Sequence, residues 1–514
     1  DRMGGCIRGH LSEVNSRTSH YFNTHTTHGR SCSFVCILVG VVTIPDTCYD
    51  CNEVDRHYRK RTKMIKKLLV FFLLFYYNQV LGLSGTLSGA AIFIALLIDA
   101  VSDPLVGSLS DATRSRWGRR HPYMYLAAIP FAGSFYLLFA PPSGLEEMGL
   151  FWWLTVFSIL TRTFMTFYSV PHMSMGAELT NDYDERTLLS SVRMVLQLVG
   201  MFAVLIGGPI VFFAATPEFE NGQLNPDAYP PFALAGFFIM VFGVWASALG
   251  THSQITKLPQ PGPDDIFSPV LMVRDMTRAF KIPSFTSLVA ASIIAGMSQG
   301  MVQALIIYTG TYFFELSATQ MTFLFTGGVV GVVSGAMLTS PLSKFIKEKK
   351  HLYIAGHCWY AVFTSYVIIL RLLDLLPSNQ DPLIAPLYII SGAISGVGLG
   401  VAVTLGASMI ADITDEHERR HGRRQEGIYY AAASFAGKAI GGSGAIFAGL
   451  IIDFAGIPKG AAPSMVSADA VVRFGWALGP AVIVLTALAV ACISFYGISR
   501  ERHREILQEL KALR

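Results

Sequence analysis

Long apolar runs alternate with short polar breaks from about residue 64 to the end of the chain. A helix needs about 20 consecutive apolar residues to cross a bilayer, and each run is long enough to do so with some tilt. The pattern therefore predicts an all-α polytopic membrane protein with about twelve transmembrane helices. The expected spans are residues 64–83, 86–110, 122–140, 150–178, 188–214, 231–251, 284–314, 320–346, 351–373, 383–412, 425–454 and 472–499.

The expected spans divide into two sets of six around a polar stretch that contains LPQPGPDD. Two six-helix halves joined by a middle loop are the layout of a major-facilitator transporter. The organisation that we expect is an N-terminal half at 64–251, a middle loop at 252–283, a C-terminal half at 284–499 and a basic tail at 500–514.

Composition supports a membrane protein. The chain has 514 residues, of which 52% are hydrophobic and 14% are charged, whereas soluble domains contain about 25% charged residues. The net charge of +4 gives no indication of a nucleic-acid partner. The spans show no nucleophile–base arrangement, so an enzyme is not expected. The short tail leaves no room for the output domain of a sensor.

Residues 1–63 differ from the rest of the chain. They are largely polar, and the apolar run at 35–45 is too short to span a bilayer. We expect an artefactual or disordered extension, with Met64 as an alternative start. Five of the seven cysteines lie there. Cys48 and Cys51 form a C-x-x-C that leaves a zinc site conceivable, although no second spaced pair follows. Cys358 and Cys492 lie in apolar runs and are expected to be small core residues.

The basic residues predict the orientation. If the spans alternate strictly, the basic loops and the tail fall on one side, and the opposite loops are neutral or acidic. Positive loops mark the cytoplasmic side, so we expect a multi-pass protein of the cell (inner) membrane with both termini inside. In the tail, Ile506, Leu507 and Leu510 form a stripe that predicts a surface helix. The basic loop segments are Arg114 to Arg120, Lys344 to Lys350 and Arg419 to Arg424.

Two carboxylates lie inside the second expected span. Asp99 and Asp103 are four residues apart and therefore share one helix face. A charge at the bilayer centre costs at least about 2.5–3.5 kcal/mol, so such residues usually face a cavity or a partner. Two close carboxylates tolerate each other when a cation lies between them or one is protonated, and oxygen ligands suit a hard cation. The alternative is that both pair with arginines and only stabilise packing.

Other charged residues follow this span in the sequence or lie in another span that we expect to contact it. Asp111 lies beside the arginines Arg114, Arg116 and Arg119 at the cytoplasmic end, and we interpret this group as a gating ion pair. In span eleven, Lys438 is a candidate to neutralise the two aspartates when no ion is bound.

Two arginines lie in spans four and five. Arg193 either presents a hydrogen-bonding fork to a hydroxylated or anionic substrate or pairs with Glu178, Asp182 or Asp184. Arg162 is expected to have a structural role.

Four stretches show a more specific similarity. DAVSDPLVGSLSDATRSRWGRRHP, FYYNQVLGLS, FYSVPHMSMGAELTNDYDER and MIADITDEHERRHGRRQEGIYYAAASFAGKAIG resemble the second, first, fourth and tenth-to-eleventh helix regions of the glycoside–pentoside–hexuronide:cation symporters, the melibiose permease family. The resemblance covers the chain from about residue 68 to the C-terminus. It implies a monomeric transporter, without a cofactor, that moves a glycoside, pentoside or hexuronide together with Na+, Li+ or H+ by alternating access.

The resemblance also implies roles for individual residues. Asp99 and Asp103 match the cation-site carboxylates, and Thr166 matches a threonine that completes that site. Ser102 stands where the melibiose permease has an asparagine, and Lys438 matches a lysine near the cation. Arg193 matches an arginine implicated in sugar binding.

The sugar half of the site departs from the family pattern. Ser169 replaces an acid that holds galactoside hydroxyls, and Met173 replaces an aromatic residue. The second sugar-holding acid aligns near Thr62, within the atypical N-terminus. The galactoside site is therefore not reproduced. Other glycosides, pentosides and hexuronides stay open, as does the alternative of a lysolipid or other amphiphile carried with a cation by the same fold.

Overall fold

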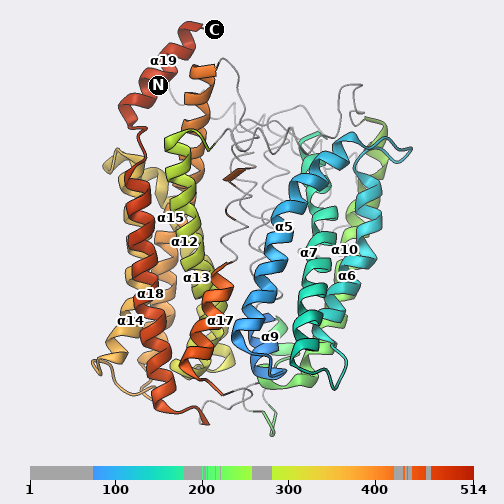
Figure 1. The fold of residues 1–514 in the computed structure, drawn as a ribbon, viewed down its shortest axis with the longest axis vertical. Coiled ribbons are helices and arrows are strands. Elements are labelled where there is room, and N and C mark those ends of the chain that lie inside the picture. Colours follow the sequence, from blue (N-terminus) through green and yellow to red (C-terminus); the bar gives the residue numbers. More distant parts are fainter. Residues whose placement is uncertain are drawn as a thin grey trace, which may run out of the picture.

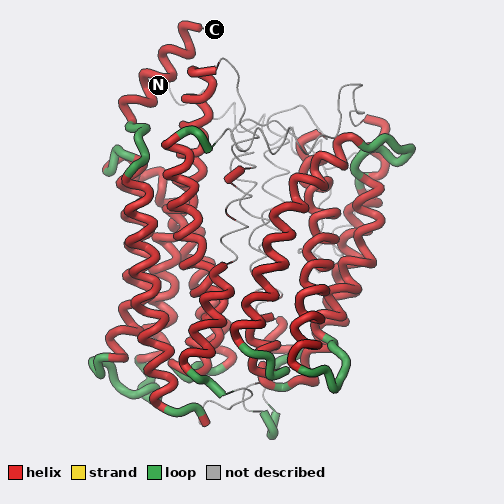
Figure 2. The backbone as a smooth tube through the Cα atoms, in the orientation of Figure 1, coloured by secondary structure: helices red, strands yellow, loops and turns green. Residues whose placement is uncertain are grey.

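The structure is a computed structural model. It describes residues 73–178, 200, 204, 207–214, 216–219, 222–257, 280–421, 432–433, 437, 443–458 and 465–513. Every regular element within these ranges is a helix (Figures 1 and 2). The prediction of an all-α membrane protein is confirmed.

Nine of the described helices are long and apolar enough to cross a bilayer. They are α5 (Gly85–Ala112), α6 (His121–Phe139), α7 (Glu147–Glu178), α10 (Tyr229–Gly250), α12 (Pro283–Tyr308), α13 (Ala318–Phe345), α14 (Lys349–Leu372), α15 (Ile384–His421) and α18 (Ala468–Ser494). The shorter helix α17 (Ser443–Ala455) lies in the expected eleventh span. Parts of the expected spans 64–83 and 425–454, and most of 188–214, lie outside the described ranges.

The first group of helices packs in the spatial order α5, α7, α6, α10. α5 contacts α7, α6 contacts α7, and α10 contacts α6. Ser84 caps α5 by accepting a hydrogen bond from the backbone N–H of Leu87, as serine commonly does at this position. After α5 the chain turns through Gly118, whose φ of +72° is favourable for glycine.

The second group contains α12 to α15, α17 and α18. Here α13 and α15 pack with their backbones in direct contact, because glycines lie on both helices. A Cβ atom at Gly396 would lie 2.6 Å from the carbonyl oxygen of Gly328, and one at Gly331 would overlap the carbonyl oxygen of Ala393. Small residues let helices approach closely in membranes. The glycine-rich stretch SGAISGVGLG (391–400) therefore serves the close packing of α15 against α13.

The two groups meet at one end of the molecule, where α5 lies beside α17 (Figure 1). We call this the far end. We call the other end, which includes the loops at 113–120 and 346–348 and the C-terminal helix α19 (Arg500–Leu513), the basic end. At the far end, a Cβ atom at Gly85 would lie 2.7 Å from the carbonyl oxygen of Gly449. Both backbone N–H groups at the start of α5 donate to Asp453, from Gly85 at 2.9 Å and from Thr86 at 2.7 Å.

Large apolar side chains cover much of the outer surface. Leu126, Met337 and Phe454 are each about two-thirds exposed or more, which suits contact with lipid rather than water. Cys358 is also exposed, and Cys492 is only partly buried. The expectation that both cysteines are core residues is wrong for Cys358, because an apolar side chain fits the lipid-facing surface of a membrane protein as well as its interior.

The tail forms the expected helix, α19. Ile506 and Leu510 are buried, whereas Leu507 is partly exposed. Since α19 packs against α15, the apolar stripe of the tail is used at least partly for contact with protein. Whether the helix also lies on the membrane surface stays a prediction.

Candidate functional site

The predicted carboxylate pair lies in the interface between α5 and α7. Thr166 of α7 places its hydroxyl 2.8 Å from Oδ1 of Asp103 and 3.2 Å from Oδ1 of Asp99. Asp99 and Thr166 are completely buried. A hydroxyl group has one proton to donate, so Thr166 satisfies only one carboxylate at a time. The structure thus brings together the three residues expected to contribute most to the cation site.

Pro104 immediately follows Asp103 within α5. Proline has no N–H and interrupts the helical hydrogen bond to the carbonyl four residues earlier, here that of Ala100. The helix backbone is therefore less regular next to the carboxylates.

Ser102 does not direct its hydroxyl towards the carboxylate groups. Its Oγ donates to the backbone carbonyl of Asp99 at 3.1 Å, as serine often does within helices. Its role as a cation ligand stays a prediction.

Arg162 lies one turn before Thr166 on α7. Its Nη1 atom is 4.0 Å from Oδ2 of Asp99, and its side chain is 3% exposed. The sequence left open that the carboxylates pair with arginines, and this contact is of that kind, although Arg162 was not named as the partner. The sequence could have placed Arg162 near the cation site, because residues four apart lie on one helix face and Thr166 was already a candidate for that site.

Two candidate substrate residues continue along α7. Ser169 is buried and Met173 is half-buried, three and seven positions beyond Thr166, which places them near the same face of the helix. Arg193 and Lys438, the other predicted site residues, lie outside the described part of the chain. The substrate-binding roles stay predictions.

The arginine-rich loop differs in exposure along its length. Arg114 and Arg116 are exposed and Arg119 is half-buried. Arg120, which was not among the predicted gating residues, is buried and donates from Nη1 to the Ser110 hydroxyl at 2.9 Å. The side chain of Asp111 is outside the described part of the structure, so its predicted ion pair stays a prediction.

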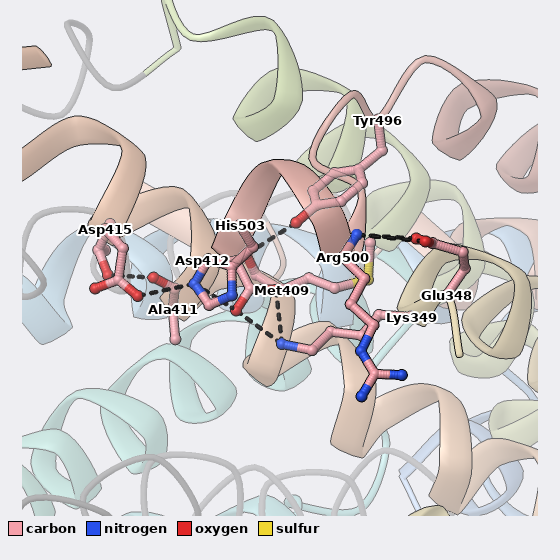
Figure 3. Close-up of polar contacts among 10 residues, drawn as sticks. Glu348, Lys349, Met409, Ala411, Asp412, Asp415, Tyr496, Arg500 and His503 are labelled. Carbon is pink, nitrogen blue, oxygen red and sulfur yellow. Dashed lines mark hydrogen bonds and ion pairs between the residues drawn. The ribbon is translucent and has the colours of Figure 1, made fainter. Parts of the chain in front are cut away.

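A second polar cluster lies at the basic end (Figure 3). Lys349 of α14 donates to both carboxylate oxygens of Asp412 on α15, at 2.8 and 2.7 Å. His503 of α19 lies 3.1 Å from Oδ2 of Asp415 and 3.5 Å from Oδ1 of Asp412. The cluster therefore connects three helices through contacts that the sequence did not predict.

Tyr496 borders this cluster in the connection between α18 and α19, and its hydroxyl points towards the carbonyl of Met409 (Figure 3). Burial raises the pKa of Tyr496, and the nearby Asp412 and Glu416 raise it further. Tyr496 is therefore neutral at physiological pH and contributes no charge to the cluster.

A third polar cluster joins the two groups of helices at the far end. Asn78 and Gln79 lie in the π-helix η1 (Tyr76–Val80), and Tyr312 lies in the π-helix η6 (Thr309–Phe313). The Tyr308 hydroxyl donates to Oδ1 of Asn78 at 2.7 Å, and the Tyr312 hydroxyl donates to Oε1 of Gln79 at 2.9 Å. All four side chains are buried. The sequence predicted no role for these residues.

Two packed groups of spanning helices, joined at one end and with carboxylates buried in a spanning helix, define a membrane transporter of the major-facilitator fold. A family model described as MFS/sugar transport protein matches residues 61–500. The chain therefore belongs to the MFS/sugar transport protein family.

Similar proteins are transporters of more than one kind of solute. The chain is 26% identical to an uncharacterized symporter of Synechocystis (87% of this chain, 93% of the relative). It is 24% identical to the isoprimeverose transporter of Lactiplantibacillus pentosus (84% and 85%). It is also 24% identical to the sodium-dependent lysophosphatidylcholine symporter 1 of Gallus gallus (87% and 86%).

Solved structures support the fold. The inward-open E. coli xylose transporter XylE matches with a TM-score of 0.57 at 15% identity, over 94% of this chain and 99% of that one. This likeness supports the predicted major-facilitator architecture.

Proposed function

We propose that this transporter couples the movement of a cation to that of a sugar or sugar-like solute. The observation that supports the proposal most directly is the Thr166 hydroxyl, which lies within hydrogen-bond distance of both Asp99 and Asp103. These oxygens, from adjacent turns of one helix and from a neighbouring helix, supply the donor type that a hard cation prefers.

The charge of the pair explains how an ion would act. Two buried carboxylates repel each other, and a Na+, a Li+ or a proton between them removes that repulsion. The bound ion would therefore stabilise the close approach of α5 and α7. Ser169 and Met173 lie further along the same helix, so an ion that orders α7 would also order the proposed solute site.

Reciprocity follows from this coupling. If the cation increases the affinity for solute, the solute must increase the affinity for the cation by the same factor. Transport would proceed by movement of the two helix groups around this site. In this proposal the basic end faces the cytoplasm, and the far-end contacts of Asp453, Asn78 and Tyr308 form the closed gate on the other side.

The solute class that we propose is a glycoside, pentoside or hexuronide. The family description and the isoprimeverose-transporting relative support a sugar. A lysophospholipid is the second candidate, because the Gallus gallus relative is named as a lysophosphatidylcholine symporter. Both candidates share the proposed cation site and differ in the solute that the remaining polar residues recognise.

Uptake into proteoliposomes tests the proposal. Labelled glycosides, pentosides, hexuronides and lysophosphatidylcholine are offered first under a Na+ gradient and then under a proton gradient. We expect gradient-driven uptake of one solute class, lost in Asp103→Asn and retained in the matched control Glu146→Gln, which changes an exposed carboxylate. Uphill uptake that survives in Asp103→Asn would refute the cation role of this pair.

A further inference from the structure

Arg162 is buried in an unusual way for a structural arginine. Its side chain is 3% exposed. Within the part of the chain that the structure describes, neither terminal nitrogen, Nη1 or Nη2, has a hydrogen-bond partner. The charged group that it approaches is the carboxylate of Asp99, at 4.0 Å. The guanidinium therefore faces the proposed cation site without being bonded to it.

A packing role does not account for this geometry. Arginine–carboxylate pairs that stabilise a structure usually close to about 2.7–2.9 Å and are often bidentate. A buried charge left without hydrogen bonds is costly. Ser158 and Thr161, on the preceding turn of α7, also have buried hydroxyls without a partner in the described structure. This stretch of α7 thus carries polar side chains on a buried face, and some of their hydrogen-bonding groups have no partner in the described structure.

We infer that Arg162 is a tethered countercharge that competes with the coupling ion for Asp99. With no ion bound, the guanidinium approaches Asp99 and offsets part of the repulsion between the two carboxylates. When an ion enters between Asp99 and Asp103, it takes over this role and the guanidinium withdraws. The Thr166 hydroxyl lies within hydrogen-bond distance of both carboxylates and remains in place in either state. The inference rests on the proposed function, because it assumes that the carboxylate pair binds a cation.

The competing charge is constant. Arginine stays protonated at all relevant pH values, so its effect does not depend on its own titration. An arginine in this position would lower the affinity of the pair for any cation, which would also help a bound ion to leave. Release matters for a transporter, since an ion that binds too tightly would hold the protein in one state.

The test is direct binding of radiolabelled Na+ to the full-length protein, purified in detergent, with Li+ as competitor and choline as an inert control. An opposite charge within about 4–6 Å changes the proton affinity of a carboxylate by about ten- to a thousand-fold, and the same electrostatic repulsion acts on a bound Na+. We therefore expect Arg162→Gln to lower the half-saturating Na+ concentration at least about tenfold. Arg162→Lys retains the charge and is expected to stay close to the wild type.

The outcomes separate this inference from the proposed function. If Asp103→Asn abolishes Na+ binding but Arg162→Gln leaves it unchanged or weakens it, the cation site stands and the countercharge is refuted. If neither the wild-type protein nor Arg162→Gln binds Na+ or Li+, the proposed binding of these ions fails and the inference falls with it.

A second comparison keeps the inference testable if Arg162→Gln alone does not fold. The double variant Asp99→Asn/Arg162→Gln removes both charges and leaves no buried charge unpaired at this contact. It is expected to bind Na+ more tightly than Asp99→Asn alone, in which Arg162 would repel the ion from Asp103. Equal or weaker binding by the double variant would overturn the inference.

Discussion

Tyr308 of α12 donates a 2.7 Å hydrogen bond to the side-chain oxygen of Asn78, a residue 230 positions earlier in the chain. Both side chains are buried, and Asn78 also accepts from Nε2 of Gln79 at 2.8 Å. The two groups of helices are therefore joined at the far end by specific polar contacts in addition to apolar packing.

Tyr308→Phe is expected to weaken this junction. A hydrogen bond contributes about 0.5–1.5 kcal/mol net, so the population closed at the far end should fall without loss of the fold. Hydrogen exchange of the backbone at 76–90 should become faster. Tyr366→Phe is the matched control, because Tyr366 is half-buried in the second group and its ring contacts Phe363 of the same helix. Unchanged exchange in Tyr308→Phe would show that the bond does not hold the far end closed.

Thr166→Val is expected to reduce the cation affinity. Valine has the shape of threonine but lacks the hydroxyl oxygen, which would be a ligand of a hard cation held between Asp99 and Asp103. The loss of one such polar contact to a charge costs about 1.5–3 kcal/mol. The half-saturating Na+ concentration for solute uptake should rise about tenfold. Thr166→Ser retains the hydroxyl and should stay near the wild-type value. Equal affinities in the two variants would remove Thr166 from the site.

Lys349→Met is expected to loosen the C-terminal helix. Asp412 is buried, and the loss of its Lys349 partner would leave His503 to balance that charge. Trypsin should then cleave faster after Arg502 and Arg504 in α19. Lys347→Met changes an exposed lysine in the neighbouring loop and should have no effect. If the two variants are cleaved at the same rate, α19 does not depend on this ion pair.

Gly331→Ala is expected to destabilise the second group of helices. The added methyl group would overlap the backbone of Ala393, whereas the same change at Gly133 in α6 meets no atom within 4 Å. Overpacking costs about 1–3 kcal/mol, so the thermal unfolding temperature of Gly331→Ala in detergent should drop. Gly133→Ala should match or slightly exceed the wild type, since alanine favours helix. A similar temperature for both variants would contradict backbone contact between α13 and α15.

The sequence predicted those features that depend on local pattern. Apolar runs long enough to cross a bilayer predicted the spanning helices, and the spacing of Asp99 and Asp103 predicted that they share a face. The resemblance added Thr166, which the structure places between them.

Contacts between distant segments could not be predicted in the same way. Neither periodicity nor a motif connects Asn78 with Tyr308, or Lys349 and Asp412 with His503, because these pairs form only when the helices are assembled. The position of Arg162 one turn before Thr166 could be predicted from spacing, whereas its 4.0 Å distance from Asp99 depends on the register between α5 and α7, which one sequence does not contain.

The glycines at the far end have a consequence for the energetics of transport. Where Gly85 and Gly89 of α5 face Gly449 and Ala445 of α17, the helices touch through backbone atoms and have almost no side chains to separate. Parting them exposes little apolar surface, and burial is worth only about 25 cal/mol per Å². Ligands must supply about 5.5 kcal/mol to move a two-state equilibrium from 1:99 to 99:1. A low apolar cost at this contact leaves more of that free energy to part the hydrogen bonds of Asp453 and Asn78, so one small ion and one small solute can still shift the equilibrium.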